Sequence, residues 1–172
     1  MATMIPGGLD FVERAPLRVV TEVSLRQSPQ QVWEVLVDTE RWPEWFRACK
    51  AARTTSEVGH GVGSTRWVHV DLFKVNERFI VWDEGEQWGF TILDANLPLA
   101  DTVVEVVRLS PEGDGTRLVY TFSIALKPWL RPLTAVFRWK FTSMFRSSLA
   151  GLAPYLDQRF APAAGAPTAQ PA

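Results

Sequence analysis

The segment Ser28–Phe46, SPQQVWEVLVDTERWPEWF, constrains the fold of this chain more than any other stretch of its sequence. Ser28 can cap a helix N-terminus, Pro29 suits the first turn, and Gln31 stands where a capping-box partner reaches back to the cap. The pattern predicts a short amphipathic helix that ends near Asp38. A compact turn follows and carries Trp42, Pro43, Trp45 and Phe46. So many large aromatic side chains are costly to leave in water, so we expect the helix and turn to close over an apolar interior.

Alternating apolar residues predict strands on both sides of this segment. The first strand, Leu17–Gln27, precedes the helix. Asp114-Gly115 suits a hairpin turn that needs positive φ, and it separates the last two strands. The strands predicted after the helix-turn are 48–56, 64–70, 73–83, 86–95, 102–109 and 116–126.

From Leu130 to about Phe160 the apolar residues recur at helical spacing, which predicts one long helix. Pro132 fits its first turn, whereas Pro154 should kink or break its last turn. The predicted apolar stripe consists of Leu133, Phe137, Phe141, Met144, Ser148, Leu152 and Tyr155.

The order and motifs of these elements resemble the START-like superfamily, also called SRPBCC or helix-grip, and its polyketide cyclase/dehydrase-like family. The resemblance rests on V-W-x-x-L-x-D followed by W-P-x-W, which begins at Val32 and ends at Trp45, and on D-G-T-R at Asp114–Arg117. It implies an α+β helix-grip fold: a seven-stranded curved antiparallel sheet wrapped around a long C-terminal helix, with two short helices between strands one and two. It also implies a hydrophobic cavity between the sheet and that helix.

The length of 172 residues suits a single domain. We expect a flexible N-terminal segment at 1–16, a START-like domain at 17–160 and a disordered Ala/Pro-rich tail at 161–172.

Composition excludes several classes of function. A formal net charge of -1 provides no footprint for nucleic acid. The single cysteine, Cys49, rules out an internal disulfide and fits a reducing cytoplasm, and the N-terminus lacks the pattern of a signal peptide. No metal-ligand spacing surrounds His60 or His69, and no nucleophile motif is present, so we expect no metal, no cofactor and no covalent catalysis.

Large side chains on the later strands and on the C-terminal helix are the candidate walls of the cavity. For each of them, ordinary core packing is the alternative interpretation. The candidates are Trp67, Trp88, Phe90, Tyr120, Phe122, Phe137, Phe141 and Met144, with Glu77 as a polar member.

Polar residues near these walls distinguish better between a ligand site and ordinary core packing, because burying a polar group without a partner costs roughly 1–3 kcal/mol. On the strand 64–70, Arg66 and His69 lie on opposite faces, and the pattern leaves open which face is inward. Glu77 shares a face with Val75 and Phe79, so it is either a buried carboxylate that pairs with Arg66 or Tyr120, or a solvated residue on the convex face. Tyr120 is either a satisfied core tyrosine or a group that contacts ligand.

Three functions fit this fold. The preferred one is binding of a hydrophobic small molecule, such as a lipid, a polyketide or an aromatic compound. The first alternative is a polyketide cyclase or aromatase that folds its substrate, with Tyr120, His69 and Arg66 as acid, base and carbonyl clamp. The second alternative is a chaperone-associated protein-interaction module, which predicts a filled core and an exposed apolar patch.

The C-terminal helix also carries basic residues among aromatic ones, notably Arg138 and Lys140 around Trp139. The preferred interpretation is the solvated face of an amphipathic helix. Contact with an anionic membrane surface is the alternative.

Overall fold

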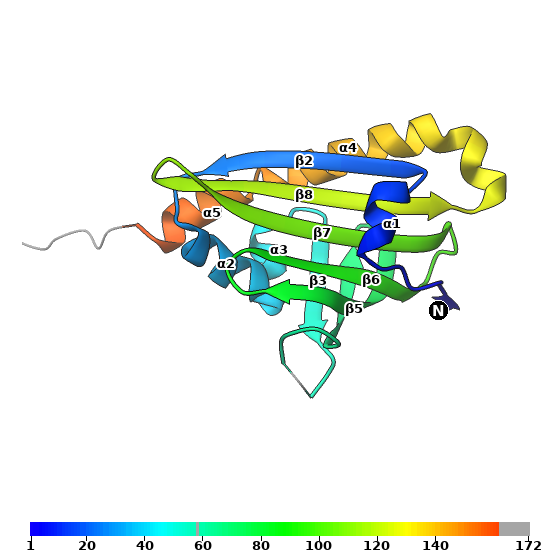
Figure 1. Ribbon diagram of the computed structural model, residues 1–172, viewed down its shortest axis with the longest axis horizontal. Helices are drawn as coiled ribbons and strands as arrows, with labels where there is room; N and C mark the ends of the chain where they lie inside the picture. The colour runs from blue at the N-terminus through cyan, green and yellow to red at the C-terminus, as the bar shows by residue number, and fades with distance from the viewer. Residues whose placement is uncertain (58, 162–172) are drawn as a thin grey trace, which may run out of the picture.

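The computed structural model describes residues 1–57 and 59–161. Seven antiparallel strands form a curved sheet in the order β2-β8-β7-β6-β5-β4-β3 (Figure 1). The strands are β2 (Leu17–Leu25), β3 (Cys49–Thr54), β4 (Thr65–Val70), β5 (Phe73–Asp83), β6 (Gln87–Ala95), β7 (Ala100–Glu112) and β8 (Gly115–Leu126). This confirms the predicted helix-grip sheet. β7 is longer than predicted, because its ladder with β8 continues to the Asp114-Gly115 turn.

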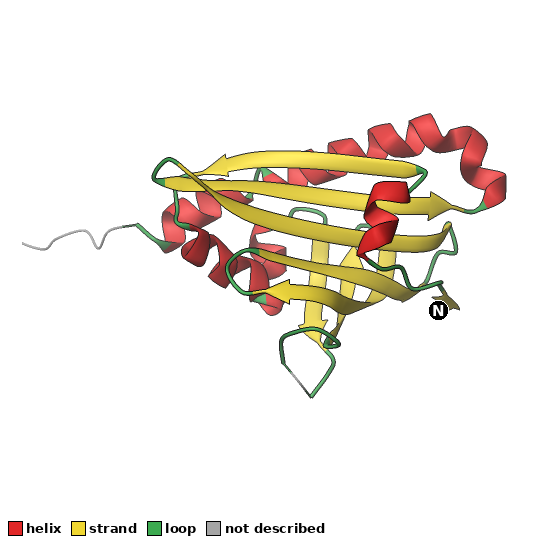
Figure 2. Ribbon diagram, in the orientation of Figure 1, coloured by secondary structure: helices red, strands yellow, loops and turns green. Residues whose placement is uncertain are grey.

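The helices that follow β2 in the chain gather at one end of the sheet and along the edge strand β2 (Figure 2). They are α2 (Pro29–Val37), the 3-10 turn η1 (Thr39–Arg41), α3 (Trp42–Trp45), the 3-10 segment η2 (Pro128–Leu133), α4 (Thr134–Leu149) and α5 (Leu152–Arg159). α4 runs beside β2, while α5 contacts α2 and α3. The two short helices between the first two long strands are therefore present as predicted.

The predicted capping box at the start of α2 is present. The Ser28 Oγ accepts from the Gln31 amide, and the Gln31 side chain accepts from the Ser28 amide. The apolar face of α2, which includes Val32 and Trp33, is buried. The helix-turn therefore packs against the sheet and closes one end of its concave side.

The C-terminal helix differs from the single helix predicted over 130–160. Residues 128–133 form η2, and the helix breaks at Ala150-Gly151 rather than at Pro154. A Cβ at Gly151 would lie 2.2 Å from the Trp45 carbonyl oxygen, so α3 passes close to the backbone at this point. Pro154 falls within the first turn of α5, where no intrahelical bond needs its missing N–H.

The N-terminal 16 residues also differ from the loose lead-in that we expected. β1 (Ala2–Thr3) pairs with β6, and α1 (Leu9–Arg14) lies on the convex face of β7. Val12 packs there with Val104 and Val106. This segment is ordered because β7 is apolar on both faces and its outer side needs a cover. The predicted disordered tail, apart from Ala161, lies outside the described residues.

Candidate functional site

A cavity opens between the concave face of the sheet, α3 and α4. Its volume is about 90 Å³. Among the described residues, its walls are apolar except for Glu77, Glu105 and Tyr120. The apolar walls are Met4, Trp42, Phe46, Val68, Val70, Phe73, Val75, Phe90, Ile92, Ala95, Leu97, Leu99, Ala100, Val103, Phe122, Ile124, Phe141, Met144 and Phe145.

The wall residues that are partly exposed to solvent line the entrance of the cavity. They lie at the β4–β5 turn (Val70, Phe73), in the β6–β7 loop (Leu97, Leu99) and on α4 (Met144). The three polar wall residues are at most 7% exposed. The cavity therefore has an apolar mouth and a polar inner end.

β4 turns Arg66 and Val68 inward, and both side chains are 1% exposed. Trp67 and His69 point to the outer face, where the Arg53 guanidinium lies 5.1 Å from the Trp67 ring centre. The predictions of Trp67 as a cavity wall and of His69 as a catalytic base are wrong for this reason: strand alternation places the two on the face opposite to Arg66.

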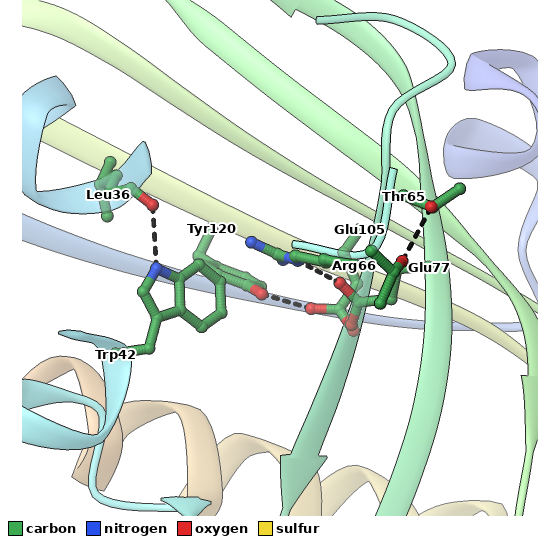
Figure 3. A network of polar contacts seen from close by, with 8 residues as sticks. Leu36, Trp42, Thr65, Arg66, Glu77, Glu105 and Tyr120 are labelled. Atoms are coloured by element: carbon green, nitrogen blue, oxygen red, sulfur yellow. Dashed lines mark hydrogen bonds and ion pairs between the residues drawn. The ribbon is translucent and has the colours of Figure 1, made fainter. Parts of the chain in front are cut away.

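Arg66 is held by one carboxylate and by aromatic rings. Its Nε donates to Glu77 Oε2 at 2.5 Å across the β4–β5 pair. Its guanidinium lies near the Trp42 ring (Figure 3), with the guanidinium carbon 4.1 Å from the Trp42 ring centre. The same carbon lies 4.7 Å from the ring centre of Phe90. Phe79 and Trp88 complete this aromatic enclosure. Of the two possible partners of Glu77, the structure therefore selects Arg66.

Glu105 is the other buried carboxyl group of the site. It lies on β7 opposite Phe122, and the Tyr120 hydroxyl of β8 donates to its Oε2 (Figure 3). No ion pair reaches Glu105 among the described residues. Tyr120 is therefore a satisfied buried tyrosine that also lines the cavity.

Burial raises the pKa of the Glu105 carboxyl to about 8, and the charge of Glu77 adds to the rise. The Tyr120 hydrogen bond and Arg66 oppose it. Burial likewise raises the pKa of Glu77, against the charge and hydrogen bond of Arg66. The pKa of Tyr120 is raised well above its ordinary value by burial and by Glu105. Near neutral pH, Glu105 and Tyr120 are therefore both protonated.

The other predicted wall residues fall into two groups. Trp88 is 1% exposed and packs behind the wall against Phe90, whereas Phe137 stacks on Phe141 outside the lining. Of the predicted set, the structure places Glu77, Phe90, Tyr120, Phe122, Phe141 and Met144 in the lining.

Glu105 and the contact of Trp42 with Arg66 were not predicted from the sequence. Glu105 is the one charged residue in the run Val103–Val107, and a carboxylate in a run buried on both faces is the signal that could have identified it. Trp42 was expected only as part of the turn that closes over the apolar interior. Its indole Nε1–H donates to the Leu36 carbonyl at 2.9 Å, and this bond fixes the ring that covers Arg66.

The C-terminal segment bears exposed aromatic and basic side chains beside the cavity. Trp129 and Trp139 are 67% and 70% exposed, and Arg138 and Lys140 are exposed as well. On the same helix, Phe141 and Phe145 face the interior. Membrane contact by this surface stays a prediction.

Two kinds of feature are absent from the described residues. No group of three or more His, Cys, Asp or Glu side chains among them is arranged to hold a metal ion. Within the same residues, no helix combines the length and apolar character needed to cross a membrane.

Known proteins share both the sequence pattern and the fold. A family model described as "Polyketide cyclase / dehydrase and lipid transport" matches residues 16–157. Uncharacterised proteins of Mycobacterium tuberculosis and Mycobacterium bovis are 32% identical over 157 residues, which cover 91% of this chain and 94% of theirs.

Solved structures extend the similarity to the three-dimensional level. The Zhui aromatase/cyclase from a Streptomyces species superposes with a TM-score of 0.69 at 17% identity, covering 86% of this chain and 98% of that one. A START superfamily protein from Mycobacterium smegmatis gives a TM-score of 0.67 at 16% identity, covering 81% and 98%. At this level of identity the match establishes the fold.

Proposed function

The chain belongs to the family of polyketide cyclases/dehydrases and lipid-transport proteins, a group with a hydrophobic ligand-binding fold, and we propose that it binds one apolar small molecule in the cavity between the sheet and α4. The observation that carries the proposal is the composition of the cavity wall, which is apolar at its mouth and has three polar side chains at its inner end. Apolar burial supplies most of the affinity of such a site, at about 25 cal/mol per Å², and the polar end orients the ligand.

The volume of the cavity limits what can enter. At about 90 Å³ it is smaller than an ordinary small-molecule site of roughly 300–1,000 Å³. The ligand is therefore small, or α4 and the β6–β7 loop move apart to admit it. α4 lies along the edge strand β2, and its Phe141 and Phe145 rings pack on β8. Movement of α4 would have to separate these ring contacts.

Binding can be tested with a neutral hydrophobic dye such as Nile red and with native mass spectrometry of the purified protein. We expect dye fluorescence to rise with saturation and apolar small molecules to displace the dye. Ala95→Leu, which fills the cavity wall, should weaken dye binding by about tenfold. Ala135→Leu, on the exposed face of α4, is the matched control and should bind as the unmodified protein does. Equal dye binding by both variants would place the dye outside the cavity and contradict the proposal.

A second candidate is polyketide cyclisation assisted by proton transfer. The observation that favours it is Glu105, whose pKa of about 8 suits a group that takes up and releases a proton near neutral pH. Tyr120 and Glu105 replace the trio of Tyr120, His69 and Arg66 that the sequence suggested.

The enzyme candidate has its own test, turnover of a poly-β-keto substrate. Glu105→Gln and Tyr120→Phe should each lower turnover by about 100-fold or more. His69→Ala, on the outer face of β4, should leave turnover unchanged. Unchanged turnover in both cavity variants would remove the catalytic roles while leaving ligand binding intact.

A further inference from the structure

The polar end of the cavity presents acidic groups and a hydroxyl group, and no cation. Glu77, Glu105 and Tyr120 line it, whereas Arg66 is absent from the lining. The cation is enclosed instead, with Nε on Glu77 and the guanidinium over the rings of Trp42 and Phe90. A ligand head group that enters the cavity therefore meets carboxyl oxygens and the Tyr120 hydroxyl first.

The charges of this buried cluster already balance without a ligand. Arg66 and Glu77 form an ion pair that is at most 5% exposed on either side. Glu105 is uncharged near neutral pH because burial and the nearby Glu77 raise its pKa to about 8. A carboxylate ligand would add a buried negative charge with no free cation to pair with, and such a charge is unfavourable because it loses its hydration.

We propose that the cavity selects an apolar molecule with an uncharged polar head, a hydroxyl or a carbonyl group, and rejects the carboxylate of the same carbon chain. The inference rests on the proposed binding function. A hydroxyl head can donate to a carboxyl oxygen of Glu77 or Glu105, and a carbonyl head can accept from the protonated Glu105. An uncharged head therefore gains hydrogen bonds at this end without a charge penalty.

One atom of the site could instead favour an anionic head group. Arg66 Nη2 is buried and has no hydrogen-bond partner among the described residues. A rotation of Trp42 that uncovered Arg66 would let this nitrogen bind an anion. Preference for a carboxylate head is therefore the result that overturns the inference.

Selectivity against the carboxylate should increase with pH. The titratable and charged groups that face Glu105 are Arg66 on β4, Glu77 on β5 and Tyr120 on β8, with Cys49 on β3 close to Arg66 and Glu77. None of the side chains that the helices bring to the lining is titratable: Trp42 of α3, Phe46 directly after it, and Phe141, Met144 and Phe145 of α4. As pH rises through about 8, Glu105 gains a negative charge and repels an anionic head further.

Displacement of Nile red by octane, octanol and octanoate tests the inference on the whole protein. At neutral pH we expect octanoate to bind at least about tenfold more weakly than octanol. The octanoate-to-octanol ratio of dissociation constants should rise further between about pH 6 and pH 9 as Glu105 ionises. This pH series needs no variant.

Glu105→Gln keeps the shape of the side chain and removes its titration, so it should abolish the pH dependence of that ratio. Glu112→Gln, at the exposed end of the same strand, is the matched control and should retain it. Octanoate binding as tightly as octanol, or more tightly, overturns the head-group inference and leaves the apolar cavity in place. Failure of all three compounds to displace the dye overturns the proposed function itself.

Discussion

Tyr120 on β8 donates a hydrogen bond to Glu105 on β7. The residue paired directly with Tyr120 in the sheet is Val107, two positions after Glu105 on the same strand. The side chains of Tyr120 and Glu105 stand on the concave face, so the bond runs diagonally between neighbouring strands. It satisfies the hydroxyl group, which is the only hydrogen-bond donor of the buried tyrosine side chain. It also keeps a carboxyl group in an apolar wall with no ion pair of its own among the described residues.

The first prediction concerns stability as a function of pH. In the unfolded chain Glu105 ionises near the ordinary value of 4.5, whereas in the folded protein its pKa is about 8. Between these values the folded state binds more protons than the unfolded state, so the free energy of unfolding falls as pH rises through this window. Each unit of pKa difference is worth about 1.4 kcal/mol, so the loss amounts to a few kcal/mol.

Glu105→Gln should remove this loss. Chemical denaturation from about pH 5 to pH 9 should show a flatter profile for the variant and a higher free energy of unfolding at the alkaline end. The exposed Glu112→Gln should follow the unmodified protein. Parallel profiles for Glu105→Gln and the unmodified protein would mean that Glu105 is ionised throughout.

The second prediction separates the buried ion pair from an exposed one. Arg66→Met leaves Glu77 buried without its partner and should lower the free energy of unfolding by about 3–5 kcal/mol. Arg117→Met breaks the half-exposed pair with Glu22 and should cost at most about 1 kcal/mol. The double change Arg66→Met with Glu77→Leu should recover much of the first loss. No recovery would show that Arg66 stabilises the fold mainly through its aromatic neighbours.

The third prediction concerns the thiol of Cys49, which is 5% exposed. Burial raises its pKa to about 11, so the reactive thiolate is scarce at neutral pH. Iodoacetamide should alkylate Cys49 slowly in the native protein and rapidly after denaturation, as followed by mass spectrometry. Prompt modification of the native protein would indicate that the β3 edge opens frequently.

The fourth prediction concerns the close approach of α3 to the break between α4 and α5. Gly151→Ala places a methyl group against the Trp45 carbonyl oxygen and should destabilise the protein by about 1–3 kcal/mol. Gly59→Ala is the matched control, because a Cβ there meets no atom within 4 Å. Thermal unfolding of the two variants measures the difference. Equal melting temperatures would mean that the helix junction adjusts freely.

Much of the fold follows from local rules that act within a few residues. The capping box of Ser28 and Gln31 and the Asp114-Gly115 turn depend on neighbours in the chain, so both were predictable. The alternation of apolar and polar residues in β5 and β8 is also a local pattern, so these strands were predictable as well. The long C-terminal helix was predicted without its break, because the break depends on the Trp45 carbonyl, which is distant in the chain.

The site was only partly predictable. Strand and helix periodicity predicted Phe90, Tyr120, Phe122, Phe141 and Met144 as wall residues, and all five line the cavity. For Glu77 the pattern left a buried and a solvated position open. The two faces of β4 could not be distinguished, since Arg66 and His69 are both polar and a one-residue difference exchanges the faces. Only pairing with β5 brings Arg66 against Glu77 and decides the question.

By itself, the sequence of the helix-turn at Ser28–Phe46 and of the strands around it determined the helix-grip fold, because caps, turns and alternation are local properties of a chain. Only the tertiary structure decided which polar side chains lie at the cavity and how they are paired. Arg66, Glu77, Glu105 and Tyr120 come from four strands, and the pKa values of the two carboxyl groups and the tyrosine are raised only once folding buries these groups together. Desolvation and Coulomb interactions act across space rather than along the chain, which is why the chemistry of the cavity appears only in the folded molecule.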